Sequence, residues 1–220
     1  MEKIAILSAN LGEFDRPMQH VEQSIQHDFV MFNDENYPPR HKAMTPRLQA
    51  KIPKCFSWQL APGYDRYLWI DGNITMTNKD TLKLFMEKCD EYDMVVLRHP
   101  GRTTIHWEGR YLQRGLEQSS SYIVGRYAGE HVSDQMEVIE DDASYVDDLL
   151  VIGGVFMYKN TPEVHAVLKE WWYHITRYLI EDQLAWAYVL KKSGLKVNII
   201  DISHTDGKYL SCRGHVAHSR

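Results

Sequence analysis

The sequence predicts an α/β protein whose mixed, mostly parallel sheet is flanked by helices. Apolar runs of strand length recur along the chain, and segments with helical spacing lie between them. The clearest run is Tyr67-Leu68-Trp69-Ile70, which leads directly into Asp71-Gly72-Asn73. A run of this kind bounded by a turn is typical of a buried strand covered on both faces. With 220 residues and 44% hydrophobic composition, residues 1–220 are expected to form a single domain around one core.

The N-terminal part is expected to alternate between strands and helices. Residues 3–7 predict a first strand, followed by Ser8 and Asn10, which could cradle a nucleotide or be plain turn residues. Residues 17–28 predict a short helix, and residues 28–32 a second strand ending at Asn33 and Asp34. The segment from Tyr37 to Lys54 holds five lysines and arginines and no acidic residue. A helix starting at Pro46 would place Arg47 and Lys51 on one face, suited to a pyrophosphate or equally to plain solvation.

The middle of the chain continues with a helix over residues 80–90 and a strand over residues 93–97. A polar group follows that could face a substrate, formed by His99, Arg102, His106 and Glu108. A histidine before a proline, as at His99, is more typical of a structural turn than of catalysis. Residues 130–148 carry eight acidic side chains and no Lys or Arg, which indicates an exposed, mobile connection, although loops that contact substrate have the same composition.

The C-terminal part begins with an apolar run interrupted by Gly153 and Gly154, a pattern that marks close approach by a ligand or another chain segment. Thr161-Pro162 predicts a helix start, with apolar positions continuing through Trp172. A second helix is expected from Glu181-Asp182-Gln183 to a stop at Gly194. Residues 196–201 predict the last strand, after which come His204 and two tail histidines, His215 and His218.

Composition narrows the function classes. A net charge of -5 argues against a surface that coats nucleic acid, although a local basic patch remains compatible with it. Three widely spaced cysteines favour reduced thiols. The absence of a long apolar segment and of a secretory signal predicts a cytoplasmic protein without a membrane span.

The strongest chemical signal is the pair Asp71 and Asn73 after the apolar strand. Open α/β sheets bind ligands at the carboxyl ends of their strands. Two oxygen-bearing side chains separated by one glycine suit a hard cation such as Mg²⁺ or Mn²⁺. An isolated Asp-Gly-Asn is more often an ordinary turn, so the neighbouring features decide its meaning.

Taken in order, these features resemble a family of glycosyltransferases. The family includes plant turgor-regulation and mucilage-related proteins and small bacterial and phage relatives. The matching features are the basic Arg47/Lys51 helix, Tyr-x-x-Tyr-Leu-Trp-Ile-Asp-Gly-Asn at 64–73, Arg-His-Pro-x-Arg at 98–102, Trp171-Trp172 and Glu181-Asp182-Gln183. The resemblance covers residues 3 to 205 and implies the Rossmann-like GT-A fold, a sheet that binds nucleotide sugars and carries a D-x-D-like metal motif after a central strand.

The resemblance also implies roles for individual residues. Asp71 and Asn73 would occupy the D-x-D positions, with His204 as third metal ligand, although most such enzymes carry aspartate in place of Asn73. Gly153 and Gly154 match the strand that lines the donor sugar, and Asp182 and Gln183 match the residues near the reaction centre. Asp182 and Glu108 are the candidates for a base on the acceptor. The nucleotide would be bound by Ser8, Asn10, Asp34, Arg47, Lys51 and Asp71.

The implied activity is a metal-dependent transfer of a hexose or pentose from a nucleoside-diphosphate sugar, by preference a UDP-sugar, to a hydroxyl acceptor. Retention is weakly favoured over inversion, and the acceptor could be a glycan, a lipid, a protein or a modified DNA base. Two other classes stay open. Asp71-Gly72-Asn73-Ile74-Thr75 also resembles the nucleophile loop of aspartate-dependent phosphatases, and Asn73 is compatible with a module that binds nucleotide sugars without turnover.

Overall fold

A six-stranded sheet forms the centre of the protein, in the strand order β2-β1-β3-β6-β5-β7. The computed structural model describes residues 2–17, 19–40 and 42–215. Only β6 runs antiparallel to its neighbours, so the predicted mixed, mostly parallel sheet is confirmed. The strands are β1 (Ile4–Asn10), β2 (Asp28–Asn33), β3 (Arg66–Ile70), β5 (Met94–Arg98), β6 (Val151–Lys159) and β7 (Val197–Ile200).

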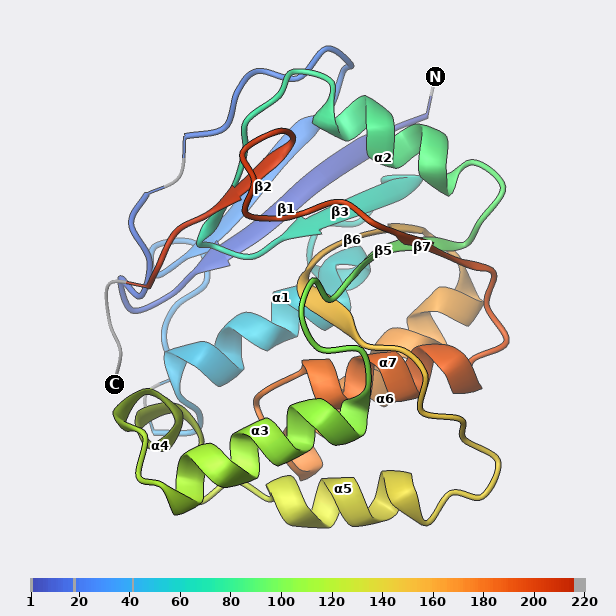
Figure 1. Cartoon of the computed structure of the whole chain (residues 1–220). Coiled ribbons are helices and arrows are strands. Elements are labelled where there is room, and N and C mark those ends of the chain that lie inside the picture. The colour runs from blue at the N-terminus through green and yellow to red at the C-terminus, as the bar shows by residue number, and fades with distance from the viewer. Residues whose placement is uncertain (1, 18, 41, 216–220) are drawn as a thin grey trace.

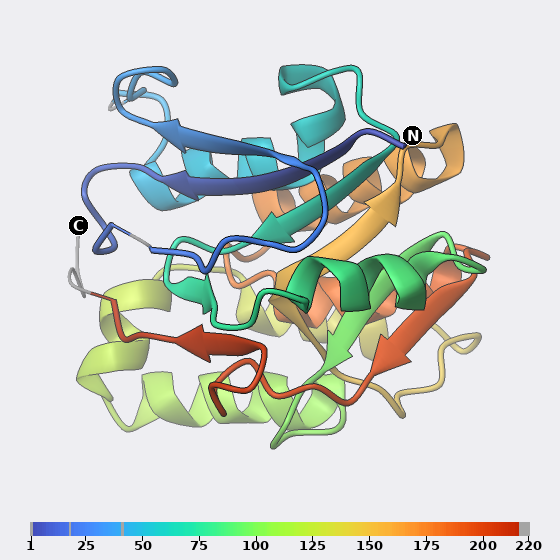
Figure 2. The ribbon, with the colours of Figure 1, turned by 90° about the horizontal axis from the view of Figure 1, so that it is seen from above.

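A second, two-stranded sheet joins β4 (Ile74–Met76) to β8 (Leu210–Cys212) near the C-terminus. Figure 2 looks down on the main sheet and shows how its strands turn progressively relative to one another. The two-stranded sheet holds the segment after β3 against the C-terminal segment, because Ile74 pairs with Cys212.

Helices cover both faces of the main sheet (Figure 1). One face packs against α2 (Thr81–Cys89), whose Leu82 and Phe85 lie in a core with Ile6 and Leu68. The other face packs against α1 (Pro46–Leu60), α6 (Pro162–Arg177) and α7 (Gln183–Lys192). Three further helices extend this second layer: α3 (Ile105–Glu117), α4 (Ser121–Tyr127) and α5 (Val132–Glu140). No described helix is long and apolar enough to cross a membrane.

Helix starts predicted from capping residues are confirmed. The side chain of Thr45 accepts a hydrogen bond from the Leu48 amide, and Pro46 occupies the first turn of α1. Thr161 does the same for Val164 at the start of α6. These caps satisfy amides that the helix itself leaves unpaired, so a short local pattern sets where each helix begins.

The predicted helix over residues 17–28 is wrong for the described residues, which form an irregular segment between β1 and β2. Two of its backbone amides donate hydrogen bonds to the β4–α2 region: Val21 donates to the carbonyl oxygen of Met76, and Ser24 to that of Lys79. The side chain of Gln23 adds hydrogen bonds to Asn78 and from Leu82. Tertiary hydrogen bonds therefore replace the helical ones.

The acidic region 130–148 is not the exposed, mobile connection that its composition predicts. It contains α5, which buries Val132, Met136 and Ile139 at helical spacing. Asp147 also caps α3 by accepting hydrogen bonds from the amides of Ile105 and His106. The sequence patterns predict no helix or strand within residues 103–127, yet this segment contains α3 and α4.

Candidate active site

Asp71 lies at the carboxyl end of β3 and is held in place from three directions. Its amide donates to the carbonyl oxygen of Gly154 at 2.8 Å, and its own carbonyl accepts from Ile74 at 2.9 Å. The indole of Trp69 donates to Asp71 Oδ1 at 2.7 Å. Asp71 therefore emerges at the sheet edge where α/β proteins bind ligands, as the sequence predicts.

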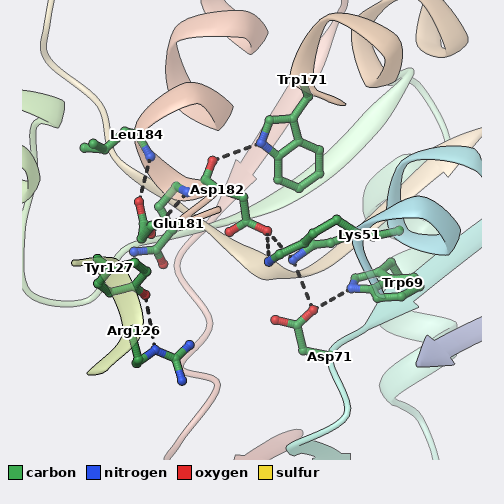
Figure 3. A network of polar contacts seen from close by, with 11 residues as sticks. Lys51, Trp69, Asp71, Arg126, Tyr127, Trp171, Glu181, Asp182 and Leu184 are labelled. Carbon is green, nitrogen blue, oxygen red and sulfur yellow. Dashed lines mark hydrogen bonds and ion pairs between the residues drawn. The ribbon is translucent and has the colours of Figure 1, made fainter. Parts of the chain in front are cut away.

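Two lysines on α1 contact the site carboxylates (Figure 3). Lys54 Nζ lies 2.6 Å from Asp182 Oδ2 and 3.1 Å from Asp71 Oδ1, and Lys51 Nζ lies 2.5 Å from the same Asp182 oxygen. Lys54 is 1% exposed. Lys54 and Asp182 come from segments 128 residues apart, and they join α1, β3 and the start of α7.

The two lysines and the two carboxylates shift one another's pKa values. Burial disfavours the charged form of Lys54, but Asp182 and Asp71 outweigh it and raise its pKa above the ordinary value. Burial would likewise raise the pKa of Asp182, yet Lys51 and Lys54 bring it well below its usual range. Burial lowers the pKa of Lys51 despite Asp182, with Lys54 contributing in the same direction. Asp182 is therefore a firmly ionised carboxylate and a poor proton acceptor.

Gly153 and Gly154 make room for these carboxylates. A Cβ atom on Gly153 would lie 2.8 Å from Asp182 Oδ1. On Gly154 it would lie 2.9 Å from Ile74 Cδ1 and 3.2 Å from Asp71 Oδ2. The close approach that the paired glycines predict is confirmed, and the groups that approach are the site carboxylates.

Two adjoining cavities open beside the network. The small cavity, about 110 Å³, lies toward β1 and is bordered by Ala9, Leu11, Phe14 and Pro46. The large cavity, about 270 Å³, is bordered by Ile152, Gly153, Gly154 and the segment 180–183. Both cavities are lined by Arg47, Lys51, Asp71, Asn73, Arg126 and His215.

Most of the predicted site residues meet here. The large cavity is lined by nine of them: Arg47, Lys51, Asp71, Asn73, Gly153, Gly154, Asp182, Gln183 and His204. Asn10 borders the small cavity, but its amide is already bonded in both directions to the backbone of Asp15. Ser8 is fully buried and borders neither cavity. Asp34 also borders neither, and its two oxygens accept from the amide of Gly12.

Glu108, predicted as a possible base, is 2% exposed and does not border the large cavity. It forms an ion pair with Arg102 and accepts from Gln183 Nε2 at 3.4 Å. Its position supports Gln183, which does border the cavity. Of the polar group predicted at residues 99–108, His106 does not join the others, because it pairs with Glu140. His99 accepts from the amides of Gly101 and Arg102, as a structural turn residue does.

Sequence reasoning missed three residues that border or complete the site. Lys54 could have been found, because it lies seven positions after Arg47 and three after Lys51 and so shares their helical face. Arg126 enters from α4 and borders both cavities, and no local pattern predicts that. Glu181 borders the large cavity, and burial, with Asp182 beside it, raises its pKa to about 7.

The predicted metal ligands form a weak donor set. Asp71 Oδ1 already accepts from Lys54 and Trp69, which leaves Oδ2. Asn73 donates through its amide nitrogen to the carbonyl of Arg213 at 3.0 Å, which leaves an uncharged oxygen. Burial lowers the pKa of His204, so its imidazole is in the neutral form that binds metals.

Within the described residues, no three His, Cys, Asp or Glu side chains gather into a metal-binding group. Ligand charge is a main determinant of affinity for hard cations. The one carboxylate among the three predicted ligands is already neutralised by Lys54. These residues therefore do not fit a divalent cation held by the protein alone. His215, the alternative histidine, is bonded to Asp15 at 2.6 Å, and His218 lies outside the described residues.

No protein-family model and no curated protein matches the chain. A solved structure that it does match is a glycosyltransferase involved in the glycosylation of the major capsid of PBCV-1. The identity is 10%, and the match covers 90% of this chain and 81% of that chain, with a TM-score of 0.44. At this level of similarity the match carries no argument about the activity of this chain.

Proposed function

We propose that this protein transfers a sugar from a nucleoside-diphosphate sugar to a hydroxyl acceptor. The observation that carries the proposal is the group Lys51, Lys54, Asp71 and Asp182 at the carboxyl edge of the sheet, beside a cavity backed by paired glycines. Cationic side chains next to a narrow glycine-lined space suit a donor with a charged diphosphate and an uncharged sugar. The resemblance to GT-A glycosyltransferases supports the same assignment.

The two cavities support an orientation for the donor. The small cavity has an apolar and aromatic border with Leu11 and Phe14, which suits a nucleobase. The diphosphate would lie where Arg47 and Lys51 border both cavities. The sugar would lie over Gly153 and Gly154, with Asp182 beside it.

The proposed reaction retains the configuration of the sugar. The bond from the anomeric carbon to the diphosphate oxygen breaks, and a bond from the acceptor oxygen to that carbon forms. The acceptor proton passes to the departing diphosphate. Lys51 and Arg47 stabilise the charge that develops there, as fixed cations do at a leaving group. Retention is supported because Asp182 is ion-paired and Glu108 is buried, so neither suits an inverting base. Inversion would require Glu181 instead.

The assignment is tested with a panel of nucleotide sugars, by thermal shift and by donor hydrolysis. We expect one donor group, UDP-sugars first, to raise the melting temperature and to be slowly hydrolysed. Asp71→Asn should abolish hydrolysis, and circular dichroism should show that the variant is folded. Glu87→Gln, an exposed change on α2, should behave like the wild type.

The other outcomes separate the rival functions. Binding without hydrolysis or transfer to any acceptor would identify a non-catalytic nucleotide-sugar module. Hydrolysis of phosphate esters with a phosphate trapped on Asp71 would identify a phosphatase. A panel with no binding at all would overturn the proposal.

A further inference from the structure

Two arginines that border the site, Arg47 and Arg126, form no ion pair with a carboxylate of the described residues. Arg47 Nη1 donates to the carbonyl oxygen of Arg126 at 3.0 Å. Arg126 Nε donates to the hydroxyl of Tyr127 at 3.4 Å, and its Nη1 is buried with no hydrogen-bond partner among the described residues. Both arginines border the small and the large cavity.

Arg66, Arg98 and Arg102 each form an ion pair with a carboxylate. Arg47 and Arg126 are partly buried, unlike the exposed arginines that have no such pair, for example Arg114 and Arg177. Glu130 acts electrostatically on Arg47, and Glu181 on Arg126, but both carboxylates accept their hydrogen bonds from backbone amides. Glu181 accepts from the amides of Gln183 and Leu184, and Glu130 accepts from that of Ile180.

Aromatic rings hold the two guanidiniums without neutralising them. Arg126 lies 5.2 Å from the ring centre of Tyr122, 5.6 Å from that of Tyr127 and 5.9 Å from that of Phe14. Arg47 lies 5.4 Å from the ring of Tyr127. Half-buried charges are normally paired, and two adjacent like charges disfavour each other. An anion that contacts both guanidiniums would therefore supply the partner that Arg47 and Arg126 lack among the described residues.

We propose that Arg47 and Arg126, with Lys51 beside them, bind the diphosphate of the donor directly, so that a nucleoside diphosphate binds without a divalent cation. The proposal rests on the proposed function and adds to it the way in which the leaving group is held. Guanidinium forks match phosphate oxygens in pairs, whereas the residues at Asp71, Asn73 and His204 offer a cation little charge. Arg126 thereby becomes a donor-binding residue, which the sequence did not predict.

The geometry also explains why α4 is fixed in place. A Cβ on Gly115 of α3 would lie 2.6 Å from Ile123 Cγ1 of α4, so the side chain of Ile123 packs directly on the backbone of α3 at this glycine. On its other side α4 is joined to α1, because Arg47 donates to the main-chain carbonyl oxygen of Arg126. The diphosphate would then be held between two helices that approach it from different sides.

The test is isothermal calorimetry with UDP, GDP, CDP and ADP, each in excess chelator and again with Mn²⁺. We expect one nucleotide to bind wild-type protein in chelator, with a Kd that Mn²⁺ changes by less than about threefold. Arg126→Gln should weaken that binding by about tenfold or more, as loss of a charged hydrogen bond does. Arg126→Lys should fall between the two, because it keeps the charge and loses the fork.

The matched control is Arg114→Gln on α3, an exposed arginine that borders neither cavity, and it should bind like the wild type. Circular dichroism and melting temperature should show that every variant is folded. Binding that requires Mn²⁺ would overturn this inference and leave the proposed function intact. An unchanged Kd in Arg126→Gln would also overturn it. No binding of any nucleotide or nucleotide sugar under either condition would overturn both.

Discussion

At the residue scale, the site depends on which atoms are already engaged. Asp71 has one oxygen bonded to Lys54 and Trp69, and Asn73 is anchored through its nitrogen to the C-terminal segment. Asp182 accepts from two lysines through a single oxygen. Asp71 and Asn73 thus keep only part of the coordination capacity that their residue types suggest, and Asp182 is already paired with two cations.

The predicted dependence on Mn²⁺ or Mg²⁺ through Asp71, Asn73 and His204 can be measured on two variants. Asn73→Asp adds a charged oxygen and restores the commoner motif, so Mn²⁺ should bind more tightly. His204→Ala should weaken any Mn²⁺ binding, because it removes a neutral imidazole. Metal titrations followed by calorimetry check both. A His204→Ala titration that superimposes on the wild type would remove His204 from the site.

Glu181 predicts a pH dependence of stability. Its pKa in the folded protein is raised to about 7, above the ordinary value for glutamate. The folded state therefore holds this proton more tightly than the unfolded state, and its contribution to stability is lost as pH rises from about 4.5 to about 7. Relative to Glu181→Gln, the wild type should lose several degrees of melting temperature between pH 5 and pH 8.

The control for that experiment is Glu137→Gln, an exposed change on α5, which should follow the wild type at every pH. If Glu181→Gln also followed the wild type, Glu181 would not titrate in this range. That outcome would leave the proposed role of Arg126 in diphosphate binding unaffected.

At the element scale, the site is the meeting point of β3, β6, α1 and the start of α7. The antiparallel strand β6 places Gly153 and Gly154 against the turn after β3, and the N-cap residue of α7 reaches across them. Because these glycines carry no side chain, two carboxylates can approach the same strand closely.

Gly153→Ala tests this packing. The new Cβ would lie 2.8 Å from Asp182 Oδ1, so this carboxylate, whose other oxygen pairs with Lys51 and Lys54, must shift. We expect a loss of about 1–3 kcal/mol in the free energy of unfolding, the usual range for overpacking, together with reduced donor hydrolysis. Urea unfolding provides the measurement. Gly101→Ala, whose Cβ would meet only His99 at 3.7 Å, should be tolerated.

At the scale of the whole molecule, one buried cation joins distant parts of the chain. Lys54 on α1 binds Asp71 after β3 and Asp182 before α7, and its ammonium lies 5.3 Å from the ring centre of Trp171 on α6. The second helical layer is thereby tied to the sheet edge where the site lies. We therefore expect both the stability of the fold and the activity to depend on Lys54.

Lys54→Met should therefore destabilise the protein on the order of 3 kcal/mol, because it leaves two carboxylates with one cation fewer. Adding Asp71→Asn should recover part of that loss, since it removes one of the unpaired charges. Urea unfolding of the single and double variants tests the coupling. Lys83→Met, which breaks an exposed pair with Glu87 on α2, should cost less than about 0.5 kcal/mol. Equal effects at the two lysines would contradict the assigned role of Lys54.

The sequence by itself determined the features that rest on local physics. The strand Tyr67–Ile70 follows from its unbroken apolar run. The start of α1 follows from Pro46, and that of α6 from the threonine cap and proline at Thr161-Pro162. Asp71, the glycine pair and Arg47 with Lys51 were found because strand ends and helix faces place them predictably.

Only the tertiary structure decided how these residues are used. Lys54 and Asp182 are paired across 128 positions, and Arg126 meets Arg47 across 79. In place of the helix predicted over residues 17–28, the described residues of this segment form hydrogen bonds with the β4–α2 region, and the high pKa of Glu181 comes from burial beside Asp182. Spacing along a chain predicts which side chains share a face of one element. It carries no information on which charges a folded interior will bring together, because that depends on how separate elements pack.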